Sequence, residues 1–160
     1  MKHIQLIQQR RAMDCVSACL AMVTGQDLET VYGEFHTKFH NYQMSIGDYL
    51  DQKDVEFDAP VPAKTPAGSL LEAGFIYILT VPCLAQNGMF HCIVADLRDY
   101  EYLNHVRVYD PAKGKPGVMF YSHHKKEIKE NPLAFQLKSW LIDAKITSAP
   151  ALEYDHNAND

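Results

Sequence analysis

The hydrophobic pattern of this chain changes its period once, and that change constrains the fold more than any other feature. Up to about residue 50, apolar residues recur at helical spacing; beyond residue 75, they gather in short runs rich in β-branched and aromatic residues. Helices therefore come first and strands follow, without βαβ alternation. This order predicts an α+β fold in which N-terminal helices pack on a mostly antiparallel sheet.

Helices are expected in three places before residue 55. The first follows Asp14, a candidate N-cap, and runs from Cys15 through an apolar segment that Gly25 ends. Because this segment is apolar nearly all round, we expect the helix to be buried. A second helix is predicted over about 27–40, and a third begins near Ser45.

The second half of the chain predicts strands separated by turns. Strands are expected at 55–57, 75–81, 89–95, 106–109 and, as an edge strand, 118–121. A proline-rich loop over 60–66 follows the first of them, and residues 132–142 predict a C-terminal helix. One domain over residues 1–147 accounts for all these elements, and residues 148–160 predict a polar, flexible tail.

Composition and charge narrow the functional class. Hydrophobic residues make up 47% and charged residues 22% of the 160 residues, as in soluble globular proteins. The formal net charge of −5 argues against a nucleic-acid-binding surface. No segment approaches the roughly 18 apolar residues that span a bilayer, and the glutamine-rich N-terminus lacks the apolar run of a signal peptide. We expect a cytoplasmic protein without membrane insertion; its oligomeric state is not indicated.

Four cysteines stand at positions 15, 19, 83 and 92. Their even number is compatible with two disulfides, but a chain of this length forms a core without cross-links. Because no secretion signal is present, reduced thiols are the preferred interpretation.

Cys15 occupies a position that suits a reactive thiol. As the first residue of the predicted helix, it lies where unpaired backbone N–H groups and the helix dipole favour an anion. The thiolate is the nucleophilic form of cysteine. Two interpretations stay open on position alone: a nucleophile, or a small apolar residue at a buried helix start.

His91 and Asp110 are the candidate partners of this thiol. His91 lies inside an apolar strand, where a buried imidazole needs a polar partner. Asp110 follows the next strand and begins an Asp-Pro turn, so its carboxylate could accept a hydrogen bond from the imidazole and set the tautomer. Singly, each has a structural explanation; together with Cys15 they form a catalytic constellation.

Three motifs carry a family resemblance. The segment Gln9–Met22 (QRRAMDCVSACLAM) resembles the active-site segment of the C39-type peptidases, the bacteriocin-processing, papain-like cysteine peptidases. That segment has a glutamine six residues before the cysteine, then Asp-Cys, then Ala-Cys-Leu-Ala-Met. Phe90–Val94 is similar to the family's histidine strand, and Val108–Gly114 is similar to its Asp-Pro turn. The motifs occur in the family's order over residues 5–115.

The resemblance implies a papain-like fold and a peptidase mechanism without a cofactor. Cys15 would be the nucleophile that forms a thioester, His91 the general base and later acid, and Asp110 the group that orients the ring. Gln9 would donate its amide into the oxyanion hole. Val16 departs from the family, which usually has glycine there. The chain also lacks the membrane spans and ATPase of the members that cut Gly-Gly leaders, so leader cleavage is not predicted.

The candidate site residues are compatible with other functions. The same triad could deamidate or transamidate a protein side chain, or an inactive domain of this fold could bind a peptide or protein. In each case the partner is a peptide or protein. A metal is not expected, because Cys15-x3-Cys19 lacks the Cys-x2-Cys spacing, and His36 with His40 lacks the Glu of a His-Glu-x-x-His motif.

Overall fold

The computed structural model describes residues 2–59, 71–99 and 106–153. The predicted proline-rich loop at 60–66 therefore lies outside the described residues, and so do residues 154–160 of the predicted tail. The elements in chain order are α1 (Cys15–Thr24), α2 (Leu28–Val31), the π-helix η1 (Tyr32–His36), α3 (Thr37–His40), α4 (Ile46–Gln52), β1 (Glu56–Asp58), β2 (Ile76–Pro82), β3 (Phe90–Asp96), β4 (Arg107–Tyr109), β5 (Phe120–Ser122), α5 (Lys125–Glu130), β6 (Ala134–Gln136), β7 (Leu141–Ser148) and the 3-10 helix η4 (Pro150–Leu152).

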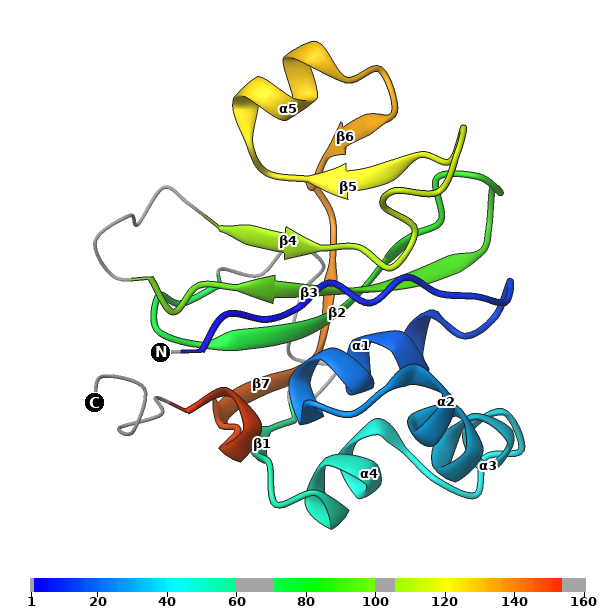
Figure 1. Ribbon diagram of the computed structural model, residues 1–160, viewed down its shortest axis with the longest axis vertical. Coiled ribbons are helices and arrows are strands. Elements are labelled where there is room, and N and C mark those ends of the chain that lie inside the picture. The colour runs from blue at the N-terminus through cyan, green and yellow to red at the C-terminus, as the bar shows by residue number, and fades with distance from the viewer. Residues whose placement is uncertain (1, 60–70, 100–105, 154–160) are drawn as a thin grey trace.

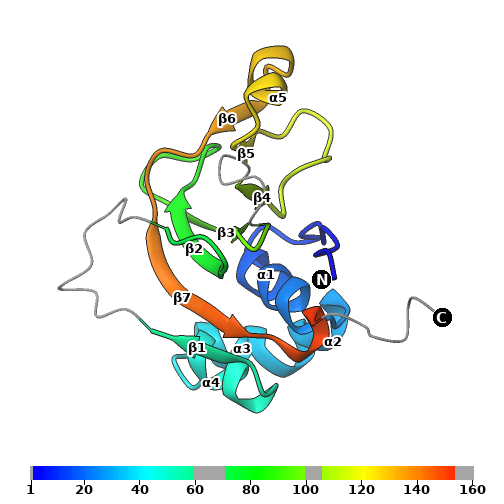
Figure 2. The same ribbon diagram turned by 90° about the vertical axis from the view of Figure 1, so that its left-hand side faces the viewer.

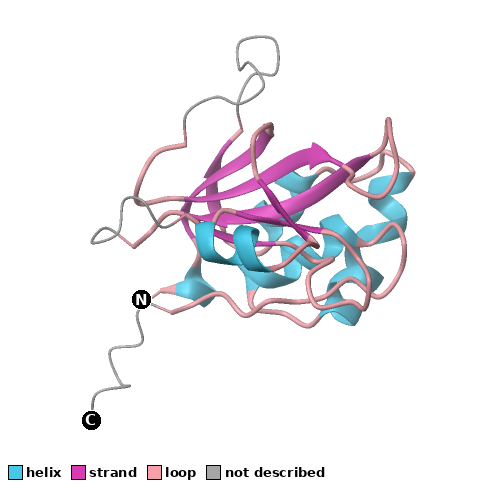
Figure 3. Cartoon of the chain, turned by 90° about the horizontal axis from the view of Figure 1, so that it is seen from above, coloured by secondary structure: helices cyan, strands magenta, loops and turns pink. Residues whose placement is uncertain are grey.

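Five strands form one antiparallel sheet in the order β1-β7-β2-β3-β4, and β5 and β6 form a small parallel pair beside it. Helices α1 to α4 lie at one end of the molecule and the β5–α5–β6 unit lies at the other (Figure 1). The connection from β6 to β7 joins the two sheets; β7 itself is a long curved strand, and α1 lies on the concave side of this curve (Figure 2). The fold is mixed α/β with a mostly antiparallel sheet and N-terminal helices, which confirms the coarse fold prediction (Figure 3).

The sheet has an apolar core on each face. On one face α1 packs against β3, with Leu20 and Val23 of the helix in the same buried cluster as Ile78 and Val94 of the strands. The opposite faces of β2 and β3 bury a second cluster that includes Tyr77, Leu79 and Ile93. Burial on both faces explains why these two strands read as continuous apolar runs.

The predicted N-terminal helices are present, with one change. α1 ends at Gly25, whose φ of 68° is the left-handed conformation that glycine adopts without steric cost. The predicted helix at 27–40 forms as α2, η1 and α3, so its middle turn is a π-helix. α4 begins after Ser45, which forms a capping box with Asp48.

The predicted C-terminal helix at 132–142 is wrong. These residues supply β6, a connection and the first residues of β7, which lies in the sheet between β1 and β2. The alternation of Ile142, Ala144 and Ile146 with polar residues has the period of a strand, and this signal was available. The helix α5, over Lys125–Glu130, was not predicted.

The described part of the predicted tail is packed rather than free. Ala149 and Leu152 are buried in the cluster around α1, and the 3-10 helix η4 contacts that helix. The packed domain therefore extends beyond residue 147, at least as far as η4. Among the residues described, no helix combines the length and the apolar character needed to cross a bilayer.

Candidate active site

Cys15, at the start of α1, lies beside His91 near the beginning of β3. Cys15 is the first helical residue, and the first intrahelical bond runs from the Ala18 N–H to the Asp14 carbonyl (2.9 Å). The N-terminal arm reaches this point along the turn that follows β4, where the Gln9 N–H donates to the Pro111 carbonyl (3.0 Å). The arm, α1 and the β4 turn are therefore joined around the thiol.

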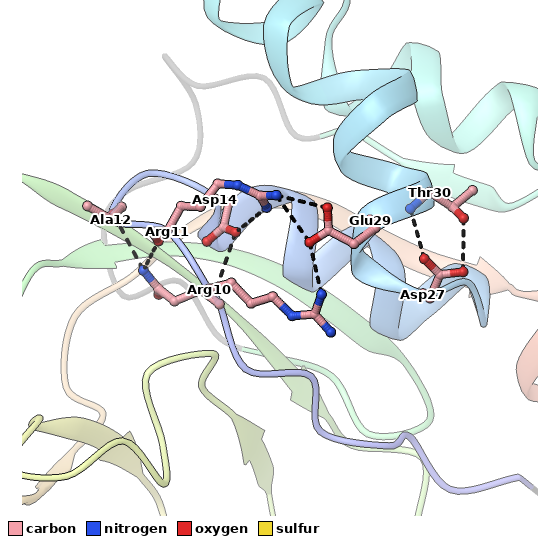
Figure 4. Close-up of polar contacts among 8 residues, drawn as sticks. Arg10, Arg11, Ala12, Asp14, Asp27, Glu29 and Thr30 are labelled. Carbon is pink, nitrogen blue, oxygen red and sulfur yellow. Dashed lines mark hydrogen bonds and ion pairs between the residues drawn. The ribbon is translucent and has the colours of Figure 1, made fainter.

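The Asp14 carboxylate does not cap the helix as predicted. Asp14 is fully buried, and its Oδ2 accepts hydrogen bonds from the Arg10 N–H and the Arg11 guanidinium (both 3.3 Å). Figure 4 shows the Arg11 guanidinium between the carboxylates of Asp14 and Glu29. Arg11 also stacks on the Tyr32 ring, 3.7 Å from its centroid. These contacts turn the charge of Asp14 toward the loop before the helix and tie that loop to α2 and η1.

His91 and Asp110 meet across the ends of β3 and β4. The His91 Nε2 lies 2.5 Å from the Asp110 Oδ1, and the two side chains are 12% and 1% exposed. Asp110 also accepts from the backbone N–H groups of Ala112 (2.9 Å) and Tyr121 (2.8 Å). Three donors therefore hold the carboxylate, and the carboxylate in turn fixes the orientation of the imidazole.

The imidazole links this carboxylate to the thiol. Burial would lower the pKa of His91, but hydrogen bonds with Asp110 and Cys15, together with their charges, raise it to about 9. Because Nε2 faces Asp110, Nδ1 is the nitrogen left for Cys15. A histidine with this pKa is cationic at neutral pH and stabilises a thiolate beside it.

All four residues predicted as site residues line a single cleft of about 840 Å³. Gln9 comes from the arm, Cys15 from α1, His91 from β3, and Asp110 from the turn after β4. The cleft walls are largely apolar and come from Met13, Val16, Phe39, Leu84, Ala85, Met89, Phe90, Val118 and Met119. Such an open apolar cleft with a few convergent polar groups is the usual form of a ligand-binding site.

Comparison of this chain with family models, curated proteins and solved structures found no match. The relation to the C39-type peptidases therefore stays a prediction that depends on the motif residues.

The Gln9 side chain is engaged in the loop that precedes Cys15. Its Nε2 donates to the carbonyls of Arg11 (3.0 Å) and Ala12 (3.4 Å), and its Oε1 is buried without a hydrogen-bond partner among the described residues. The longer of the two bonds is the weaker one. An anionic oxygen in the cleft could therefore compete with the Ala12 carbonyl for one amide hydrogen.

The other cysteines have different surroundings. All four thiols are free, but Cys19 and Cys92 are buried and hydrogen-bond to each other between α1 and β3. Burial raises the pKa of Cys19; the hydrogen bond with Cys19 and burial raise the pKa of Cys92. Cys83 lines the cleft on the β2–β3 connection.

A second hollow, of about 600 Å³, lies along β4, β5 and α5. Its lining includes Arg107, Lys113 and Glu127, and Lys113 and Glu127 form an ion pair (2.8 Å). None of the four cysteines lines it, whereas the first cleft contains a thiol, an imidazole and a carboxylate. We therefore assign the candidate active site to the first cleft.

His36 stacks on the Tyr32 ring, with centroids 4.2 Å apart, and its ring lies 4.4 Å from that of His40 at an angle of 57°, so this histidine pair belongs to an aromatic cluster. The structure also adds residues that sequence reasoning missed. Thr80 lines the cleft and donates to Asp143 Oδ2 (2.6 Å). Asp143 was missed because no strand was predicted after the helix expected at 132–142; a carboxylate among alternating apolar residues was the available signal.

Proposed function

We propose that this protein is a cysteine peptidase of papain-like fold that hydrolyses a peptide bond through a Cys15 thioester. The observation that carries the proposal is the buried His91–Asp110 contact of 2.5 Å beside Cys15 at the start of α1. A turn-forming aspartate and a core histidine would not require a thiol as the third member. The order thiol, imidazole, carboxylate is the arrangement that nucleophilic catalysis needs.

The first half-reaction forms the acyl-enzyme. The Cys15 thiolate attacks the carbonyl carbon of the scissile amide, and the C–S bond forms while the carbonyl electrons move onto oxygen. When the tetrahedral intermediate collapses, the C–N bond breaks and the amine leaves with the proton of the His91 imidazolium. In the second half-reaction, His91 removes a proton from water, and the resulting hydroxide attacks the thioester, releasing the carboxylic acid and Cys15.

Oxyanion stabilisation is assigned to the Gln9 amide and the Cys15 backbone N–H. The first N–H groups of an α-helix have no intrahelical acceptor, so that of Cys15 is available to an anion. Gln9 lines the same cleft and can exchange its weak bond to the Ala12 carbonyl for one to the oxyanion. A preorganised donor of this kind contributes about 2.7–4 kcal/mol to transition-state stabilisation.

The proposal is tested by thiol labelling followed by cleavage profiling. In the folded protein, iodoacetamide should modify Cys15 well below about pH 8, ahead of Cys83, and should not reach Cys19 or Cys92. The wild-type protein should then cleave members of a proteome-derived peptide library. Cys15→Ala should abolish cleavage, whereas Cys83→Ala, the matched change in the same cleft, should retain it.

Two results would contradict the proposal. Equal labelling of all four thiols, with a midpoint near about 8.5, would remove the activated nucleophile. Selective labelling of Cys15 without cleavage of any library peptide would show that the site performs another acyl transfer or only binds its partner.

A further inference from the structure

Asp143 is a partly buried carboxylate that the proposed mechanism does not use. It lies in β7, where Ile78 of β2 pairs with Ala144 and Leu79 pairs with Ile142. Asp143 is therefore the extra residue of a β-bulge, a device that redirects a side chain out of the ladder. Its Oδ2 accepts a hydrogen bond of 2.6 Å from the Thr80 hydroxyl.

Through Thr80, this carboxylate is connected to the candidate active site. Thr80 lines the cleft and pairs in the sheet with Cys92, the residue directly after His91. The negative charge of Asp143 also adds to the raised pKa of Cys92, after the larger effects of the hydrogen bond with Cys19 and of burial. Thr80 therefore forms part of the cleft wall beside Cys92, the residue after His91, and Asp143 lies behind Thr80.

The charge of Asp143 is not balanced within the described protein. Burial raises the pKa of Asp143, and the Thr80 hydroxyl is its hydrogen-bond donor. Among the ion pairs of residues 2–59, 71–99 and 106–153, none involves Asp143. Partial desolvation of a carboxylate without a cation is unfavourable, so a cationic group that reaches Thr80 from the cleft would offset part of that cost. The net charge of −5 also favours the approach of a cationic ligand.

We propose that Thr80 and Asp143 form a specificity subsite that binds a lysine or arginine side chain of the peptide substrate. The Thr80 oxygen, which donates its hydrogen to Asp143, keeps lone pairs for an ammonium or guanidinium donor. The carboxylate behind it supplies the opposite charge. This assignment depends on the proposed peptidase function and names the substrate class of that site.

The test is a positional-scanning library of internally quenched peptides. Each position carries lysine, arginine or norleucine, which is an uncharged residue of similar length. At one position the wild-type protein should show at least about a tenfold higher kcat/KM for lysine or arginine than for norleucine. In Asp143→Asn this ratio should fall to near one, because kcat/KM for the lysine and arginine peptides decreases. Asp51→Asn, the same charge change on exposed α4, should leave the ratio unchanged.

Several outcomes would overturn the subsite. A wild-type protein that cleaves peptides with no basic preference at any position contradicts it, whether or not Asp143→Asn folds. A preference that persists in a folded Asp143→Asn protein shows that Asp143 only holds the bulge.

Failure of the proposed function itself is recognised separately, by the absence of cleavage of every peptide. In that case, Cys15 is labelled with 2-aminoethyl and 2-sulfonatoethyl methanethiosulfonate, and the rates are read by mass spectrometry. A cationic preference that is reduced in Asp143→Asn supports the subsite, and equal rate ratios in the two proteins overturn it.

Discussion

Two cysteines, Cys15 and Cys19, lie one helical turn apart on α1, and each thiol pairs with a different side chain of β3. Cys15 is partly exposed in the cleft and meets the imidazole of His91. Cys19 is fully buried and meets a second thiol, that of Cys92. The first pair can separate charge, because the Asp110 carboxylate supports a cationic imidazole. The second pair cannot, because burial disfavours a thiolate there. We therefore expect the neighbouring group, rather than the residue type, to decide which cysteine is reactive.

The largest expected effect is the loss of kcat/KM when the contacts of His91 with Cys15 and Asp110 are removed. His91→Ala and Asp110→Asn should each lower kcat/KM by about 10² to 10⁴, and the double variant should lose little more, because the residues act as one unit. His91→Ala should also slow alkylation of Cys15 near neutral pH. Cys19→Ala, the matched change in the deeper pair, should leave kcat/KM almost unaltered.

Small, additive losses from His91→Ala and Asp110→Asn would instead indicate a structural role for both residues. Melting temperatures of all variants are needed beside the kinetics, since substitutions at buried positions reduce stability by themselves.

The next effect concerns the oxyanion donor, which the deeper pair does not have. Gln9→Ala should lower kcat by about 10² to 10³, as expected for loss of one oxyanion donor. It should leave the alkylation rate of Cys15 nearly unchanged, because alkylation of a thiol builds no oxyanion. Gln8→Ala is the control, since the Gln8 amide donates to the exposed Lys113 carbonyl (2.9 Å) instead. Equal losses from Gln8→Ala and Gln9→Ala would remove the assignment.

The smallest expected effect is on the stability of the protein: the Tm loss caused by a substitution should depend on pH for the first pair and not for the second. The folded-state pKa of His91 is raised from 6.5 to about 9, so its charge stabilises the fold fully below about pH 6.5. This contribution, on the order of 3 kcal/mol for such a shift, is lost as the pH rises through about 9. The Tm difference between wild type and His91→Gln should therefore be larger at about pH 6 than at about pH 9.5.

Cys19→Ala provides the comparison for this experiment. Because burial raises the pKa of Cys19, its thiol stays neutral in the folded protein, and the Tm loss of the variant should be nearly constant from about pH 6 to about pH 7.5, below the titration of the unfolded thiol at about pH 8.5. A Tm difference for His91→Gln that is equally constant would contradict the charged imidazole.

Much of the local structure was predictable because it depends on short-range rules. The local signals include the helix cap at Ser45 and the helix end at Gly25. The apolar runs around Ile78 and Ile93 are a further local signal, for strands. The segment at 132–142 was mispredicted because the helix-forming residues around Leu137 outweighed the strand period that begins at Ile142. Pairing of Ala134–Gln136 with β5 and of residues 141–142 with β2 decides its state, and such long-range pairing has no local signature.

The sequence by itself determined the order of helices and strands, and it placed a cysteine at a helix start, where backbone N–H groups are unpaired. It also nominated His91 and Asp110, because a histidine in an apolar strand requires a partner and an Asp-Pro turn can supply one. Gln9 was nominated only through the resemblance to the C39-type peptidases. Only the tertiary structure decided that Asp14 turns to Arg11 rather than to the helix, and that Asp143 lies behind Thr80 in the cleft. The physical reason is that hydrogen bonds of buried charges are satisfied across elements far apart in the chain, whereas periodicity and capping act within a few residues.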